Sequence, residues 1–282
     1  AEAARKNNAV ATAAVFGGIR YETDTAAMFS PGISYTAATR GMADVLPFYP
    51  DSSVRGGSWN YLPGSRSEAL DIAAQLRKAR YEVQLDTGYL ATEEAFLALG
   101  REKTSPRILH IATHGFFFPD PKEAAGNGPS LSDRDNTVFR LSDNPMMRSG
   151  LILAGANQAW RTGTGPKNRE DGILTAYEIS HTDLSGTELA VLSACETGLG
   201  EIESNEGVYG LQRAFKIAGV KYLIMSLWKV NDAGTREFMA EFYRYWLEKQ
   251  MTIPEAFRKA QAHMKAKYPD SPYHWAGFVL VE

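Results

Sequence analysis

The residues of this chain best suited to covalent chemistry are its single cysteine, Cys195, and the histidine His114. Cys195 follows an apolar run at 188–193, and His114 follows another at 107–113. Each run is typical of a buried strand, so the thiol and the imidazole both come just after a strand end. In open parallel sheets this carboxyl edge is where ligands and reactive groups collect. The pattern indicates a candidate Cys/His dyad.

Such a dyad would use the thiolate as the nucleophile, with a nearby imidazole helping the thiol to ionise. Ala194 precedes the cysteine and Gly115 follows the histidine, and these small neighbours let a substrate carbonyl approach the backbone. The backbone N–H groups of Gly115 and Cys195 are then candidate oxyanion donors. A second interpretation stays open, because a lone cysteine is often only a small buried apolar side chain.

The other histidines are interpreted as structural. His110 lies four residues before His114, and on a continuous strand both would face the same side, as in half of a metal site. The chain has neither a Cys-x-x-Cys nor a His-Glu-x-x-His pattern, so we predict no metal and no cofactor. His110 lies inside an apolar run and is interpreted as a core residue, while His181, His263 and His274 fall in a turn, an amphipathic helix and the region near the end.

Three carboxylates are candidates for the wall of a substrate pocket: Asp171, Glu196 and Asp232. Asp232 comes shortly after the apolar run 222–227. If that run forms the strand next to the one before the cysteine, its end borders the site, and Asp232 could receive a basic side chain. The alternative is that Asn231 or Asp232 only caps the helix that follows.

Composition narrows the class of protein. The net charge of −3 provides no field that favours nucleic acid or an anionic membrane, and no apolar run reaches the length of about 18–20 residues that spans a bilayer. We therefore predict no nucleic-acid contact and no membrane association. One cysteine allows no intramolecular disulfide, which favours a reducing compartment and predicts a cytoplasmic protein. The sequence begins without Met or a signal-peptide pattern, so we expect it to be cut from a longer chain.

Apolar periodicity predicts alternating strands and helices, which is typical of a parallel sheet covered by helices. A Ser-Arg-Ser-Glu capping box at 65–68 predicts the start of the first helix, and Thr92 and Thr175 are predicted caps of two more. The predicted strands are 9–21, 81–85, 108–113, 151–154, 188–193, 222–227 and 275–281, and the later helices are 93–99, 176–180, 206–218, 232–248 and 253–267. Residues 22–60, 116–149 and 155–172 lack a clear period and are predicted loops.

Several motifs together resemble the bacterial CHAT domain, a caspase-like peptidase domain often attached to tetratricopeptide repeats. They are LPGSRSEA (62–69), ATEEAF (91–96), ILHIATHG (108–115), DGILTA (171–176), LSACETGLG (192–200), EGVYGLQRAF (206–215) and SLWKVND (226–232). The resemblance covers roughly residues 60–282. Residues 22–60 and 116–149 match less well, and we interpret them as loop-rich elaborations of a single domain spanning 1–282.

The resemblance implies the caspase–separase–gingipain fold, an α/β fold in which a central, mostly parallel sheet lies between helical layers in a three-layer α/β/α sandwich. It also implies a cysteine endopeptidase acting on protein or peptide substrates, with His114 and Cys195 as the dyad. The 226–232 motif is similar to a separase segment that supplies an acidic residue to a pocket for a basic P1 side chain, which corresponds here to Asp232. N-terminal repeats or an activator protein are the implied regulatory partners.

Two other classes of function stay open. A chain with an intact dyad could be a latent or scaffolding module whose site is regulated by a partner, with 22–60 and 116–149 occluding the cleft. It could also be a small-molecule thiol hydrolase such as an amidase, which would require a closed pocket rather than an open groove beside Cys195.

Overall fold

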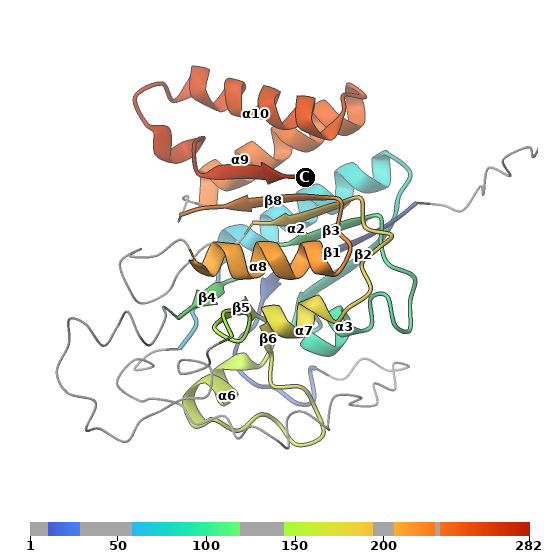
Figure 1. The fold of residues 1–282 in the computed structure, drawn as a ribbon, viewed down its shortest axis with the longest axis vertical. Helices are drawn as coiled ribbons and strands as arrows, with labels where there is room; N and C mark the ends of the chain where they lie inside the picture. Colours follow the sequence, from blue (N-terminus) through green and yellow to red (C-terminus); the bar gives the residue numbers. More distant parts are fainter. Residues whose placement is uncertain (1–10, 29–57, 119–143, 194–205, 229–231) are drawn as a thin grey trace, which may run out of the picture.

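A computed structural model describes residues 11–28, 58–118, 144–193, 206–228 and 232–282. At its centre is a sheet with the strand order β2-β1-β3-β7-β8-β9 (Figure 1). The strands are β1 (Thr12–Ile19), β2 (Glu82–Gly88), β3 (Ile108–Ile111), β7 (Leu189–Leu192), β8 (Tyr222–Ser226) and β9 (Phe278–Val281). Neighbouring strands are parallel except β9, which runs antiparallel to β8. The mostly parallel sheet predicted from the sequence is confirmed.

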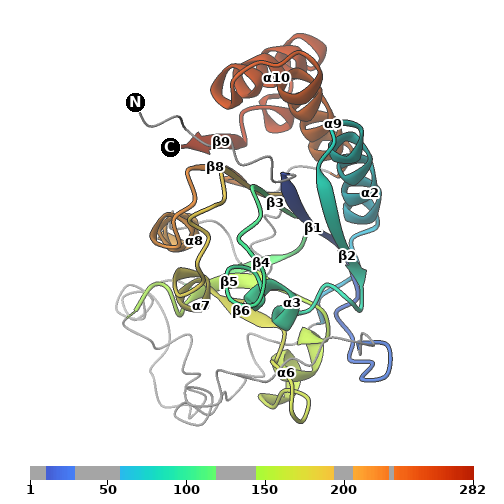
Figure 2. The same cartoon turned by 90° about the vertical axis from the view of Figure 1, so that its right-hand side faces the viewer.

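Helices cover both faces of this sheet, as Figure 2 shows. One layer consists of α2 (Pro63–Lys78), α9 (Asp232–Tyr243) and α10 (Ile253–Lys267), with a π-helical turn, Arg244–Glu248, after α9 and a 3-10 turn, Pro272–His274, before β9. The other contains α3 (Glu93–Leu97), α7 (Ala176–Ser180) and α8 (Glu206–Ile217). The predicted three-layer α/β/α arrangement is therefore confirmed.

Side-chain alternation along the strands builds a core on each face. On β3, Ile108 packs in the core beneath α2, α9 and α10, whereas Leu109 and Ile111 pack in the core that contains α3, α7 and α8. Burial on both faces explains why the inner strands β3, β7 and β8 are nearly continuous apolar runs in the sequence. His110 is fully buried, so its interpretation as a core residue is confirmed.

A second, antiparallel sheet is formed by β4 (Gly115–Phe117), β5 (Ser149–Ile152) and β6 (Ile173–Thr175), in the order β4-β5-β6. The prediction of loops over 116–149 and 155–172 is wrong where β4, the start of β5 and the helix α6 (Ala156–Thr162) lie. These elements have three to seven residues, too few to establish a period in the sequence. Residues 119–143 lie outside the described residues.

Capping residues explain where several helices start, and one predicted helix start differs from the structure. Thr92 and Thr175 accept backbone N–H groups of their helices as predicted, and Thr252 does the same for α10. The predicted capping box at 65–68 is wrong, because α2 already begins at Pro63. The hydroxyl of Ser65 donates to the Leu62 carbonyl instead and accepts the N–H of Gly18 at 3.0 Å. Ser65 therefore joins α2 to the end of β1.

Candidate active site

The strands that precede the two predicted dyad residues are neighbours in the sheet. Strands β3 and β7 are parallel, with Ile111 opposite Leu192, and the N–H of Ser193 donates to the Ile111 carbonyl at 2.9 Å. Ile111 is three residues before His114 in the sequence, and Ser193 is two residues before Cys195. Both strands end at the carboxyl edge of the sheet, where α/β proteins place their ligands. Cys195 and Glu196 themselves lie outside the described residues.

His114 is buried at this edge and has a defined hydrogen-bond acceptor. Only 2% of the residue is exposed, and its Nε2 atom lies 2.7 Å from the carbonyl oxygen of Asn60. A carbonyl can only accept, so Nε2 must carry the proton in this contact. In the neutral imidazole, Nδ1 then carries the lone pair that can take up a proton.

The backbone of His114 is fixed by the second sheet. Its carbonyl accepts the N–H of Ile152 on β5 at 2.9 Å. The preceding residue, Thr113, donates its hydroxyl to the Ile152 carbonyl and lies 3.0 Å from the hydroxyl of Tyr21. Because Thr113 uses its only proton on Ile152, Tyr21 is the donor in that pair. These bonds hold the turn between β3 and β4 in one conformation.

The imidazole of His114 contacts two aromatic rings. The rings of Tyr21 and Trp59 each have their centroid 5.0 Å from that of His114. Trp59 in turn packs edge-on against Trp160 of α6 at 4.9 Å, and Trp160 stacks on Phe118. This aromatic wall limits the rotation of the imidazole and excludes water from one side of it.

His110 and His114 belong to different parts of the molecule, which corrects the expectation that they share a face. β3 ends at Ile111, and the chain then turns into β4 before His114 can continue the alternation. The Nε2 of His110 lies 3.0 Å from the Glu68 carboxylate, and its Nδ1 lies 3.2 Å from the Tyr243 hydroxyl. Burial raises the pKa of Tyr243 well above its usual value. This buried network holds α2 and α9 on the sheet, away from the site.

Some polar atoms at the carboxyl edge are buried and have no hydrogen-bond partner among the described residues. They are the indole nitrogens of Trp59 and Trp228 and the hydroxyl of Ser193. Trp59 contacts His114, Ser193 follows β7, and Trp228 follows β8. A buried donor left unsatisfied costs about 1–3 kcal/mol, so such atoms need a partner from the rest of the chain, from water or from a ligand. Ser193 and Trp228 follow two adjacent strands, so this edge of the sheet offers polar groups to a ligand.

Of the predicted pocket carboxylates, Asp232 follows a strand next to β7, whereas Asp171 lies in the second sheet's region. Asp232 is the first residue of α9, which follows β8, and β8 is the neighbour of β7 as the prediction required. Because α9 begins at Asp232, a cap would be Asn231, which lies outside the described residues. Asp171 accepts the N–H of Ile173 at 2.8 Å, and β5 lies between it and His114.

Asp171 belongs to a group of acidic residues around the start of α3 that the sequence did not indicate. Glu93 is buried and accepts the Gly172 N–H at 2.9 Å, while Glu94 pairs with Arg169. Burial, followed by the negative charges of neighbours that include Glu178 and Asp171, raises the pKa of Glu93 well above its usual value. Folding therefore shifts the ionisation equilibrium of Glu93 toward its neutral form.

Gly115 opens β4 and lies opposite Leu151, next to His114. Its role as an oxyanion donor stays a prediction. In the described part of the chain no group of three or more His, Cys, Asp or Glu side chains could hold a metal ion. Over the same residues, no helix has both the length and the apolar character needed to cross a bilayer.

Comparison with known proteins identifies the family to which this chain belongs. The profile of the CHAT domain matches residues 2–282. Tetratricopeptide repeat protein 28 of Mus musculus is 30% identical over 253 residues, 88% of this chain and 10% of its own length. The human protein of the same name is 30% identical over 255 residues with the same coverage. The chain thus spans about a tenth of the curated relatives it matches.

Two solved structures are more distant. The Arg-specific cysteine proteinase gingipain R superposes with a TM-score of 0.45 and 12% identity, covering 83% of this chain and 44% of its own. A protein from Geobacter sulfurreducens gives a TM-score of 0.43 and 13% identity, with coverage of 90% and 89%. The family assignment rests on the profile, which extends over nearly every residue. This chain belongs to the CHAT domain family.

Proposed function

We propose that this CHAT domain is a cysteine endopeptidase in which Cys195 is the nucleophile and His114 its acid–base partner. The observation that carries the proposal is the hydrogen bond from Ser193 to Ile111, because it ties together the strands that precede the two residues. The buried polar atoms at the same edge that have no partner among the described residues support it, since a peptide main chain offers both donors and acceptors.

The proposed reaction has two stages. The Cys195 sulfur attacks the carbonyl carbon of the scissile peptide, and the N–H groups of Gly115 and Cys195 stabilise the oxyanion, each worth about 3 kcal/mol. Nδ1 of His114 takes the thiol proton as the sulfur attacks and passes it to the leaving amine as the C–N bond breaks, which leaves a thioester on Cys195. Water then attacks the thioester and releases the carboxylic acid and the free thiol. The contact between Nε2 and Asn60 supports Nδ1 as the nitrogen that exchanges the proton.

We propose that the domain prefers substrates with Arg or Lys at P1 and that Asp232 binds this basic side chain. Glu196 and Asp171 would be further carboxylates of the P1 pocket. The position of Asp232 after β8, the neighbour of β7, supports the first assignment. A reducing compartment such as the cytoplasm would keep the single thiol available.

We further propose that attached repeats or an activator protein regulate the domain. The relatives are named tetratricopeptide repeat proteins and are about ten times as long as this chain, which supports a setting in which repeats and the CHAT domain occur together.

A second candidate is a latent or scaffolding module. The 2% exposure of His114 favours it, because a general acid has to reach the leaving group of its substrate. The two candidates differ in what the isolated domain does: a peptidase cleaves once a substrate or activator is supplied, whereas a scaffold does not.

A P1-scanning peptide library tests the proposal. The chain, with and without candidate repeat segments, is incubated with peptides that carry Arg, Lys, Asp or Met at P1, alongside Cys195→Ala and Cys195→Ser. We expect cleavage after Arg and Lys that both substitutions abolish. Cleavage that persists in Cys195→Ala would exclude Cys195 as the nucleophile, and a library left intact under all conditions would favour the scaffold.

A further inference from the structure

A short segment, residues 58–60, lies directly over His114 and is here called the strap. Asn60 accepts from Nε2 of the imidazole at 2.7 Å, and the Trp59 ring lies against the imidazole with 5.0 Å between centroids. Only 9% of Trp59 is exposed. The strap belongs to none of the described strands or helices, so it has no ladder of backbone hydrogen bonds to fix its position.

The side chain of Asn157 takes the place of that ladder. Its Oδ1 accepts the N–H of Trp59 at 2.8 Å, and its Nδ2 donates to the Trp59 carbonyl at 3.1 Å. One amide thus pairs with both backbone groups of a single residue, in the manner of a neighbouring strand. Asn157 is 1% exposed, so these bonds are shielded from competition with water.

Asn157 is itself held in one orientation. Its backbone N–H donates to the Tyr21 carbonyl at 2.9 Å, and its Nδ2 also donates to the carboxylate of Glu22 at 2.9 Å. A hydrogen bond from Arg161 lowers the pKa of Glu22, which keeps this acceptor ionised. Arg161 also donates to the hydroxyl of Ser58 at 2.8 Å. The first turn of α6, through Asn157, and its last turn, through Arg161, therefore bind the strap at two consecutive residues.

We propose that Asn157 is a positioning residue for the acid–base chemistry of His114. By fixing Trp59, it holds the Asn60 carbonyl on Nε2, and that contact selects the tautomer with its lone pair on Nδ1. Without the contact the imidazole would exchange between both tautomers, and only part of the population would be ready for proton transfer. The catalytic part of this inference rests on the proposed peptidase function, whereas the selection of the tautomer does not.

Nitrogen-15 NMR of the histidine side chains tests the inference, because the two tautomers give different nitrogen shifts. The chain has five histidines, and loss of one signal in His114→Ala assigns the relevant one. We expect His114 to be the Nε2–H tautomer in the natural chain and a mixture of tautomers in Asn157→Leu, which has a similar volume and no polar atoms. Gln158→Ala is the matched control, since it removes a neighbouring amide of α6 for which no side-chain hydrogen bond to the strap exists among the described residues.

A milder variant covers the case in which Asn157→Leu fails to fold. Asn157→Asp keeps the acceptor for the Trp59 N–H but places a carboxylate beside the Trp59 carbonyl and Glu22. We expect a smaller shift of the tautomer population in the same direction. An unchanged Nε2–H population in a folded Asn157 variant would overturn the inference, because a residue that only anchors loops would lower stability without changing the tautomer.

Kinetics separate this inference from the proposed function. With a cleavable peptide, Asn157→Leu should lower kcat on the order of ten- to hundredfold with little change in KM, as expected when a reacting group is misplaced. Gln158→Ala should match the natural chain. If no peptide is cleaved by the natural chain, the proposed function fails, and the NMR comparison still decides whether Asn157 sets the tautomer.

Discussion

The N–H of Ser193, one residue beyond the end of β7, donates to the carbonyl of Ile111, the last residue of β3, at 2.9 Å. This bond ties the carboxyl end of the strand before Cys195 to the end of the strand before His114. Ile111 and Leu192, which are 81 residues apart in the sequence, are thus paired across a single strand spacing of about 4.8 Å. The chemistry proposed for the edge depends on this neighbourhood.

Substitution of Asp232 separates the two interpretations of that residue. If Asp232 pairs with a basic P1 side chain, Asp232→Asn should lower kcat/KM for Arg and Lys peptides by about 30-fold or more, since losing one partner of a buried charge pair costs about 2–5 kcal/mol. Other peptides should be little affected. Asn231→Ala is the control: if Asn231 caps α9, its loss should lower the free energy of unfolding by about 1 kcal/mol and leave P1 preference unchanged. Equal losses for all peptides in Asp232→Asn would remove Asp232 from the pocket.

The buried network of Glu68, His110 and Tyr243 should contribute to stability rather than to activity. Glu68→Ala leaves the Nε2 of His110 buried without its partner, and we expect it to lower the free energy of unfolding by about 3 kcal/mol. Tyr243→Phe removes one hydroxyl contact and should cost about 1 kcal/mol.

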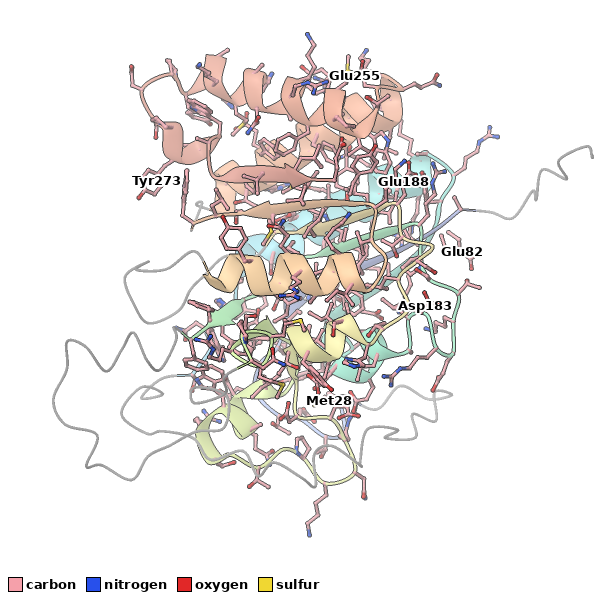
Figure 3. The ribbon with its side chains drawn as sticks, in the orientation of Figure 1. Met28, Glu82, Asp183, Glu188, Glu255 and Tyr273 are labelled. Atoms are coloured by element: carbon pink, nitrogen blue, oxygen red, sulfur yellow. The ribbon has the colours of Figure 1, made fainter. Side chains whose placement is uncertain are left out.

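Urea-induced unfolding measures both effects. Glu82→Ala is the matched control, because Glu82 is an exposed carboxylate at the periphery of the molecule (Figure 3), and its loss should change the free energy of unfolding by less than about 0.5 kcal/mol. A cost for Glu68→Ala no greater than that for Glu82→Ala would show that the network does not stabilise the fold.

The raised pKa of Glu93 predicts a pH dependence of stability. Between the ordinary carboxyl pKa, about 4.3, and the higher value in the folded chain, the folded state binds one proton that the unfolded state has released. This group's contribution to stability therefore falls as the pH rises through that interval. Glu93→Gln keeps an acceptor for the Gly172 N–H and cannot ionise.

The free energy of unfolding of Glu93→Gln relative to the natural chain should accordingly increase with pH above about 4.3. Chemical denaturation from pH 4 to pH 8 measures this difference, and Glu82→Gln at an exposed position should give a difference that does not depend on pH. Parallel stability curves for Glu93→Gln and the natural chain would contradict the raised pKa.

The inner strands β1, β3, β7 and β8 of the central sheet were predictable because each is an apolar run buried on both faces. The carboxyl edge of these strands located His114 from the sequence. The strap was not predictable, because Trp59, His114 and Asn157 are far apart in the sequence and meet only through folding. The partners of His110 could not be predicted for the same reason, since Glu68 and Tyr243 contact it from helices that pack on the sheet. Strands such as β4 and β6 have three residues each, which is too short for alternation to be seen.

The most direct test of the account is covalent labelling with a peptidyl acyloxymethyl ketone that carries Arg at P1, followed by intact mass measurement. Because the chain has one cysteine, any single thiol adduct identifies Cys195. We expect one adduct per chain, formed far more slowly in folded His114→Ala and absent in Cys195→Ala. No adduct in the natural chain under any activating condition, or an equal labelling rate in His114→Ala, would contradict it.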